Sequence, residues 1–326
     1  CRATILLKSG RVEEARAMLE HGAASNPWAE CREYFLRSLA ALRLREQQYA
    51  AATELLQPAA SPVVSILRFH AFAAQNKVAD ARREMDRAGM DACIAVQARQ
   101  TVEETRWLLD LADAHPYIAG VIGWIDLQAD DVAAQLEPFA THPKLVGVRH
   151  VVQDEPEDRF LLRPSFCRGV SLLEDLNLAY DILIYPRHLP AAAEFVSRFR
   201  RQRFVLDHLA KPDIRSGEIR EWETGLRRLS THPHVFCKLS GLVTEAHWNR
   251  WTPDQIRPYL DVAFDCFGAY RLMAGSDWPV CTVAGDYRRT ISVIDDYLAG
   301  RPAEERTAVM GGNAARFWNL RAGERV

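Results

Sequence analysis

The sequence predicts an α/β protein whose main part is a TIM-type (β/α)8 barrel with a missing or substituted first strand, preceded by a small α-helical repeat segment. Two observations support the barrel. Short apolar segments alternate with helical segments between residues 93 and 275, at about 25–35 residues per unit, as a parallel sheet covered by helices requires. Polar residues also follow nearly every apolar segment. We therefore expect helical hairpins over residues 1–77 and the barrel over residues 78–326.

Composition narrows the classes of function. The chain has 326 residues, 48% of them hydrophobic, enough for one large core. A net charge of -2 and a pI near 6.6 give no basic field for nucleic acid. No apolar run approaches the roughly 20 residues of a membrane helix. The seven cysteines form no CxxC pair, which favours reduced thiols and a cytoplasmic location. The chain begins with Cys1 rather than Met, so we expect a fragment or a trimmed sequence.

The first 77 residues have a helical pattern with a weak internal repeat. The stretch SGRVEEARAMLEHGAASNP, which ends at Pro27, resembles one tetratricopeptide hairpin. A second copy follows at a spacing of about 35 residues but lacks the glycine. Generic helical hairpins would have a similar pattern. Repeats of this kind usually form a surface for a protein partner.

Residues 63–78 join the two parts, and their pattern is ambiguous. The stretch VVSILRFHAFAAQN could begin a third hairpin, or residues 63–70 could form a buried strand that ends in His70. Periodicity cannot separate a helix from a strand in so short an apolar run. A strand there would be the eighth, which is the number that closes a barrel.

Seven strands are expected after this joint, each an apolar segment bounded by polar or turn residues. A doubly wound open sheet is the alternative, but no glycine-rich phosphate loop follows the first strand. The expected strands are 93–96, 117–125, 145–151, 180–185, 204–207, 235–239 and 271–275, and the expected helices lie near 78–88, 130–140, 166–177, 190–200, 217–231, 253–265, 287–299 and 303–320.

The strand ends carry the candidate site, because active sites of β/α barrels lie at the carboxyl ends of the strands. In order, these residues are Gln97 and Arg99, Trp124 and Asp126, Arg149 and His150, Tyr185, Arg187 and His188, Asp207 and His208, Lys238 and Ser240, and Asp277. His150 and His208 directly follow branched apolar runs, whereas His188 is expected in a surface turn. Asp277 could be a general base, a metal ligand or a helix cap.

Six motifs carry a resemblance to a known family: VGVRHVVQDEP, YDILIYPRHLP, FVLDHLAKPDI, VFCKLSGLVTEAHW, AGSDWPVC and GGNAARFWNL. Together they resemble the amidohydrolase-2 family, and within it the branch that includes L-fuconolactonases and related sugar lactonases. The resemblance runs from about residue 78 to 320. It implies a barrel hydrolase that opens a sugar lactone similar to L-fucono-1,5-lactone, sometimes with a divalent metal.

The resemblance also implies roles for individual residues. Asp277 would be the general base that activates water, and His208 and His150 would position or polarise the lactone carbonyl. The remaining implied residues bind the substrate or shape its pocket: Arg149, Tyr185, Arg187, Lys211, Trp124 and Trp278. This division suits ester hydrolysis, which needs a base for water and donors where the oxyanion develops.

One departure from the family concerns metal binding. The family's first strand ends in a His-x-His segment, and the N-terminal part of this chain, before residue 93, has no such pair; Arg68-Phe69-His70 is the candidate replacement. A zinc or manganese ion would then have at most His208, Asp277, His150 and His70 as ligands, a poor set for zinc. A gene fusion that lacks the first strand, a degenerate barrel kept for binding, and an improvised strand at residues 63–70 all remain open.

Two functions from different classes therefore stand as the main hypotheses, beside a third possibility, an amidohydrolase that acts on another cyclic ester or amide. The first is a lactonase whose substrate is a sugar lactone and whose base is Asp277. The second is a catalytically impaired barrel that binds a protein partner through the helical repeats. Neither nucleic acid nor a membrane is expected as a partner.

Overall fold

The computed structural model describes residues 16–21 and 78–320. The chain divides into two compact units: Cys1–Glu84 with Trp278–Val283, and Met85–Asp277 with Ala284–Val326. In the first unit, residues 16–21 are helical and Leu19 is fully buried. The repeats expected before residue 78, and the strand or helix expected at 63–70, otherwise lie outside the described residues. The second unit contains the sheet and is described below.

The second unit is built on one parallel sheet of seven strands in chain order, each paired with the next. This order, with a helical crossover between successive strands, is that of a β/α barrel. The strands are β1 (Cys93–Val96), β2 (Ile118–Gly123), β3 (Leu145–His150), β4 (Ala179–Ile182), β5 (Phe204–Leu206), β6 (Val235–Leu239) and β7 (Leu272–Ala274).

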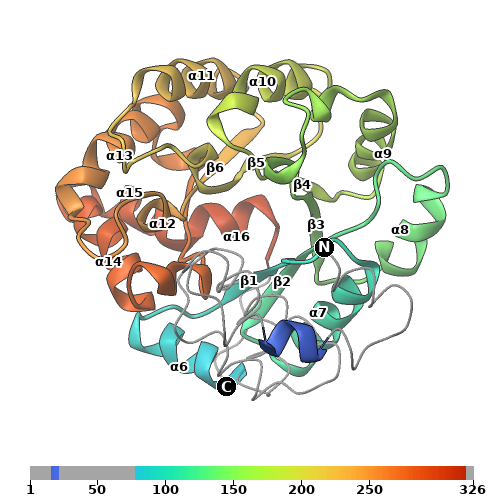
Figure 1. The fold of residues 1–326 in the computed structure, drawn as a ribbon, viewed down its shortest axis with the longest axis horizontal. Helices are drawn as coiled ribbons and strands as arrows, with labels where there is room; N and C mark the ends of the chain where they lie inside the picture. Colours follow the sequence, from blue (N-terminus) through green and yellow to red (C-terminus); the bar gives the residue numbers. More distant parts are fainter. Residues whose placement is uncertain (1–15, 22–77, 321–326) are drawn as a thin grey trace. The chain divides into compact units, whose positions relative to one another are not determined.

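Helices cover the outer side of the sheet, as Figure 1 shows for the segments between β2 and β7. The helices of the described residues after the joint are α6 (Val78–Arg87), α7 (Val102–Ala114), α8 (Val132–Ala140), α9 (Pro164–Asp175), α10 (Leu189–Ser197), α11 (Arg220–Ser230), α12 (Leu242–Glu245), α13 (Pro253–Phe267), α14 (Tyr287–Leu298), α15 (Ala303–Thr307) and α16 (Asn313–Phe317). None of the described helices is both long and apolar enough to cross a membrane.

Local sequence fixes where several of these helices begin. Thr101 caps α7 by accepting a hydrogen bond from the Glu104 backbone N–H at 3.2 Å. Asp286 caps α14 in the same way, with the Arg289 N–H at 2.7 Å. Side-chain acceptors at these positions satisfy backbone donors that have no partner within the helix.

Helix α7 packs directly on the end of β2. A Cβ at Gly123 would lie 2.6 Å from Cγ2 of Thr105, so only glycine allows the helix to come this close. The Thr105 hydroxyl accepts from the Trp124 N–H at 2.7 Å and donates to the Trp124 carbonyl at 2.8 Å. The sequence prediction gave no helix between the first two strands. The structure adds α7, and the Thr105 hydroxyl on this helix fixes the backbone of Trp124.

The short C-terminal helix α16 leads into Phe317 and Trp318, which pack against inward side chains of the sheet. In Figure 1 it crosses the middle of the ring of strands and helices. Phe317 and Trp318 belong to one core cluster with inward side chains of five strands, namely Ile122, Val146, Ala179, Val205 and Met273. Asn313 holds the start of this helix to the chain around β7 by donating to the carbonyls of Ala269 and Leu272, both at 2.7 Å.

The predicted strands are confirmed within a few residues, and so is the arrangement of a parallel sheet covered by helices. Besides the unpredicted helices α7 and α12, one of the expected helices differs from the prediction. Residues 303–320 do not form a continuous helix, because a π-helical turn at Ala308–Gly312 separates α15 from α16. This turn contains two adjacent glycines, which weaken a regular helix. The break lets α16 change direction, so that Phe317 and Trp318 pack against the core of the sheet.

Candidate active site

A left-handed turn follows β5 and carries the first candidate residue. From His208 to Lys211 four successive residues have φ between +51° and +57°. This conformation costs roughly 1–2 kcal/mol for each residue with a Cβ. Burial and a hydrogen bond hold the turn in place: Leu209 is fully buried, and its carbonyl accepts from the Trp222 indole N–H at 2.6 Å. Strain of this kind is typical of a functional segment.

His208 lies between the ends of β6 and β7. Its Nδ1 is 2.8 Å from Oγ of Ser240, and its Nε2 is 3.6 Å from Oδ1 of Asp277. The backbone of Asp277 also has a positive φ of 53°. Burial lowers the pKa of His208, although the carboxylates of Asp277 and Asp207 oppose this. The pair therefore combines a neutral imidazole with a carboxylate at the carboxyl ends of two strands.

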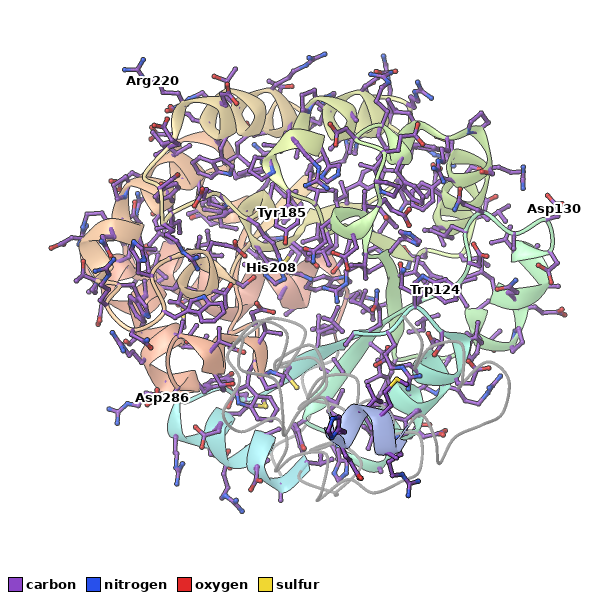
Figure 2. All side chains as sticks on the ribbon, in the orientation of Figure 1. Trp124, Asp130, Tyr185, His208, Arg220 and Asp286 are labelled. Carbon is purple, nitrogen blue, oxygen red and sulfur yellow. The ribbon has the colours of Figure 1, made fainter. Side chains whose placement is uncertain are left out.

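Tyr185 and Lys211 form a second group near this pair. The Lys211 ammonium lies 5.6 Å from the centre of the Tyr185 ring and 3.9 Å from Oε1 of Glu245. Burial raises the pKa of Glu245; Lys211 opposes this increase, and Asp277 adds to it. Figure 2 shows His208 and Tyr185 near the middle of the view, whereas Arg220 and Asp130 lie at its periphery. A cation, a phenol and two carboxyl groups thus lie around the strand ends.

His150 forms a separate hydrogen-bonded group at the end of β3. The Trp124 indole N–H donates to its Nδ1 at 3.4 Å, and its Nε2 lies 2.8 Å from Oε1 of Glu155. The ring stacks on Phe160 with centroids 4.8 Å apart. Burial lowers the pKa of His150, and Glu155 partly opposes this. Both ring nitrogens are engaged, so another ligand at His150 would displace one of these partners.

Beneath the strand ends, four charged side chains form a cluster inside the sheet. Asp207 accepts from Arg149 at 2.8 Å and lies 2.6 Å from the Lys238 ammonium, which also donates to Asp181. Arg149 further donates to the Gln97 carbonyl, and the Gln97 side chain donates back to the Arg149 carbonyl at 3.0 Å. Both carboxylates are fully buried, whereas Arg149 and Lys238 side chains are 11% and 13% exposed.

The pKa values of the two buried carboxyl groups are shifted in opposite directions. Burial raises the pKa of Asp181 to about 6, although Lys238 opposes the increase. Burial would also raise the pKa of Asp207, but Lys238 and Arg149 together outweigh it and hold that pKa below its usual range. Asp207 is therefore the permanent anion of the cluster.

The structure places the predicted site residues in different environments. His208 and Asp277 lie together, and Tyr185 and Lys211 lie near them. Arg149 was expected at the substrate, but its guanidinium is held within the buried cluster. Arg187 is half exposed and pairs with Asp158 at 2.9 Å. Trp278 belongs to the other unit, and His70 lies outside the described residues; their roles stay predictions.

His188 does not fit the surface turn that the sequence favoured, because it is fully buried. Its Nδ1 accepts the Tyr185 backbone N–H at 3.1 Å. The leucine and proline that follow His188 begin helix α10 rather than a surface loop. His188 therefore holds the backbone of Tyr185 in place.

The sequence placed Lys238 and Ser240 among the strand-end candidates without assigning them a role, and it did not single out three other residues that the structure brings into the site: Glu155, Glu245 and Asp181. One sequence signal was available for Asp181, which interrupts an otherwise apolar strand in YDILIY. An unpaired carboxylate is costly in such a position, so a buried cation was to be expected. Glu155 and Glu245 lie in loops or short helices, where their contacts depend on tertiary structure.

The described residues do not by themselves fit a metal centre. His208 and Asp277 would be two ligands, and a zinc site ordinarily has three or four from the protein. His150 is held by Trp124 and Glu155. Within residues 16–21 and 78–320, no group of three or more His, Cys, Asp or Glu side chains could hold a metal ion.

Two curated relatives carry the same name, L-fucono-1,5-lactonase. The protein from Burkholderia ambifaria is 40% identical over 242 residues, which are 72% of this chain and 82% of the relative. That from Burkholderia multivorans is 41% identical over 247 residues, with 72% and 83% covered.

A solved structure is similar as well. It is a crystal structure of an amidohydrolase from Burkholderia multivorans with bound zinc. Its TM-score is 0.72 at 41% identity, and the alignment covers 74% of this chain and 88% of that chain.

The parallel sheet, its helical cover and the His208–Asp277 pair at the strand ends define a β/α-barrel protein with a site at the usual end of the barrel. The chain belongs to the amidohydrolase family, which it matches over residues 55–320.

Proposed function

We propose that this protein hydrolyses a sugar lactone similar to L-fucono-1,5-lactone, with Asp277 as the general base. The observation that carries the proposal is the placement of the Asp277 carboxylate 3.6 Å from a buried histidine at the ends of neighbouring strands. The names of the curated relatives support the substrate class. Identities near 40% over most of both chains make a shared class of reaction the simplest expectation.

The reaction needs only groups that this site supplies. The Asp277 carboxylate takes a proton from water while the water oxygen attacks the lactone carbonyl carbon. The carbonyl oxygen becomes an oxyanion, which the neutral His208 stabilises by donating a hydrogen bond. The ring C–O bond then breaks, and protonated Asp277 returns its proton to the departing ring oxygen. The product is an open-chain sugar acid with a new hydroxyl, and its carboxylic acid then releases a proton to the solvent to become a carboxylate.

Tyr185, Lys211 and Arg187 are suited to hold the substrate during this reaction. The Lys211 ammonium and the Arg187 guanidinium lie 5.6 and 5.3 Å from the Tyr185 ring centre. A phenol between two cations can bind several hydroxyls, and the cations favour the anionic product and the transition state that leads to it. His150 and Trp124 would form the wall on the β3 side. A zinc or manganese ion, which the family resemblance implies, would need ligands from further residues besides His208 and Asp277.

A panel of cyclic substrates tests this proposal. Purified protein is mixed with L-fucono-, galactono- and rhamnono-lactones, a pyrone and a cyclic amide, and acid release is followed with a pH indicator against the spontaneous rate. The panel is run with a chelator, with added zinc and with added manganese. Turnover of one or more sugar lactones is expected. If no substrate is turned over above the spontaneous rate under any condition, the proposal that this protein is a hydrolase of cyclic esters is contradicted. If only the pyrone or the amide is turned over, the proposed substrate class is contradicted.

The second hypothesis, a catalytically impaired barrel that binds a protein partner, finds no support in the described residues. The residues proposed to bind such a partner, 1–77, lie almost wholly outside them.

A further inference from the structure

Ser240 contacts Nδ1 of the His208 ring, whereas the other ring nitrogen, Nε2, lies towards Asp277. Its Oγ lies 2.8 Å from Nδ1 of the imidazole. Ser240 is 4% exposed and His208 is 8% exposed, so water has little access to this contact. Hydrogen bonds in such an environment are strong, and a missing partner there is costly.

The geometry points to Ser240 as a positioning residue that fixes the neutral tautomer of His208 with its proton on Nε2, beside Asp277. The inference rests on the proposed function for its catalytic meaning, but the tautomer itself does not depend on substrate. No role was assigned to Ser240 on the basis of the sequence.

Charge decides which nitrogen carries the proton. Nε2 is 3.6 Å from a carboxylate oxygen of Asp277. A carboxylate accepts hydrogen bonds and repels the lone pair of an unprotonated nitrogen, so an N–H at Nε2 is favoured. Nδ1 then carries the lone pair and needs a donor. A serine hydroxyl can donate, so Ser240 completes a chain from its O–H to Nδ1 and from Nε2–H towards Asp277.

The backbone prevents the imidazole from leaving this arrangement. Gly241 has a φ of +65°, and a Cβ there would lie 2.8 Å from Cγ of His208. The ring therefore lies against the glycine backbone. Ser240 and Gly241 follow β6 directly, so the rigid sheet holds both the donor and the surface on which the ring rests.

The consequence for catalysis is a donor of fixed direction. A neutral imidazole with its proton on Nε2 presents an N–H on the side where Asp277 lies, and the developing oxyanion can accept it. The opposite tautomer would present a lone pair to the oxyanion and would repel it. Ser240 thus acts on the reaction only through His208.

The test reads the tautomer directly. Protein labelled with 15N-histidine is examined by two-bond 1H–15N correlation spectra, which distinguish Nε2–H from Nδ1–H imidazoles, and the His208 signals are those lost in His208→Gln. We expect the Nε2–H pattern in the wild type, with or without a chelator. We expect a mixture of tautomers in Ser240→Ala and a largely restored pattern in Ser240→Thr.

The matched control is Ser230→Ala, which removes another buried hydroxyl. Ser230 is 8% exposed and donates to the Arg227 carbonyl at 2.9 Å on α11. The His208 signals of the Ser230→Ala protein should match those of the wild type. With a lactone substrate, Ser240→Ala should lower kcat about tenfold, as the loss of one hydrogen bond would, and Ser230→Ala should not.

Two results would overturn the inference. One is an Nδ1–H pattern in the wild type, and the other is an unchanged tautomer in folded Ser240→Ala. If no lactone is hydrolysed while the spectra follow the expectation, the proposed function fails and the assignment of Ser240 stands. The wild-type spectrum alone decides the matter if the Ser240 variants do not fold.

Discussion

Gly241 shows how a single backbone position supports the site. It has a φ of +65°, and any side chain there would press on the ring of His208. Gly217 is its natural comparison, because it has a φ of +76° and no atom within 4 Å of an added Cβ. Alanine would therefore meet a similar backbone penalty at both positions, but only at Gly241 would its Cβ press against the His208 ring.

We expect Gly241→Ala to lower kcat at least about tenfold, because a shift of the imidazole disturbs the alignment that catalysis needs. Gly217→Ala should keep the wild-type kcat and lose only about 1 kcal/mol of unfolding free energy. Steady-state kinetics and urea denaturation of the two variants measure both quantities. Equal kcat values for the two variants would show that the ring of His208 does not depend on this glycine.

Asp181 makes the stability of the protein depend on pH. Its pKa is about 6 in the folded protein, above its ordinary value of 3.8. A carboxyl group with a raised pKa contributes stability that is fully present below the unfolded pKa and is lost as the pH rises through the folded one. Asp207 has the opposite sign, but its lowered pKa acts at more acidic pH.

Removal of this carboxyl group should flatten the pH dependence. Between pH 5 and pH 7.5 the wild type should lose on the order of 1 kcal/mol more unfolding free energy than Asp181→Asn does. Urea midpoints at the two pH values give this difference. Parallel changes in the two proteins would mean that Asp181 titrates as an ordinary carboxyl group.

At the scale of elements, the positions of the strands could be predicted closely, whereas the course of the C-terminal helix α16 could not. Apolar runs such as FVL and VFCKL are short and bounded by polar residues, so their positions follow from local sequence. The direction of α16 depends instead on the π-helical break at Ala308–Gly312 and on the contacts of Phe317 with the core cluster. Such packing is a property of the tertiary structure and has no periodic signal.

Helix α16 should matter for stability rather than for chemistry. Phe317 is 7% exposed, and its ring lies 4.7 Å from that of Phe236 within the core. Phe317→Ala should cost about 3–5 kcal/mol of unfolding free energy, with little change in kcat where the variant is folded. Tyr270→Ala, at a side chain that is 55% exposed, is the control and should cost far less. A large loss of kcat in folded Phe317→Ala would place this helix in the catalytic machinery.

At the scale of the whole molecule, local sequence located the site but not its internal connections. Asp277 and His208 could be predicted because each follows an apolar strand, and strand ends of a parallel sheet converge. The cluster of Arg149, Asp181 and Lys238 could not, since these residues lie on three different strands and their pairing depends on register. This difference explains why Arg149 was expected at the substrate and lies in the interior.

The family match and the fold agree over the second unit, and the site is built from its strand ends. In the proposed mechanism, hydrolysis depends on one carboxylate that takes a proton from water and on a neutral imidazole that donates a hydrogen bond to the oxyanion. The cluster beneath them fixes the strands, and the left-handed turn directs His208 towards Asp277. Removal of the Asp277 charge should therefore abolish the chemistry and leave the fold intact.

The most direct measurement is the kcat of Asp277→Asn with L-fucono-1,5-lactone, beside Asp130→Asn as a control at a fully exposed carboxylate. Loss of a general base predicts a fall of about 10²–10⁴-fold in kcat. The circular dichroism spectrum should be unchanged, and the unfolding free energy from urea denaturation should stay within about 1 kcal/mol of the wild-type value. Asp130→Asn should behave as the wild type. A folded Asp277→Asn protein that turns over the lactone at the wild-type rate would contradict the account.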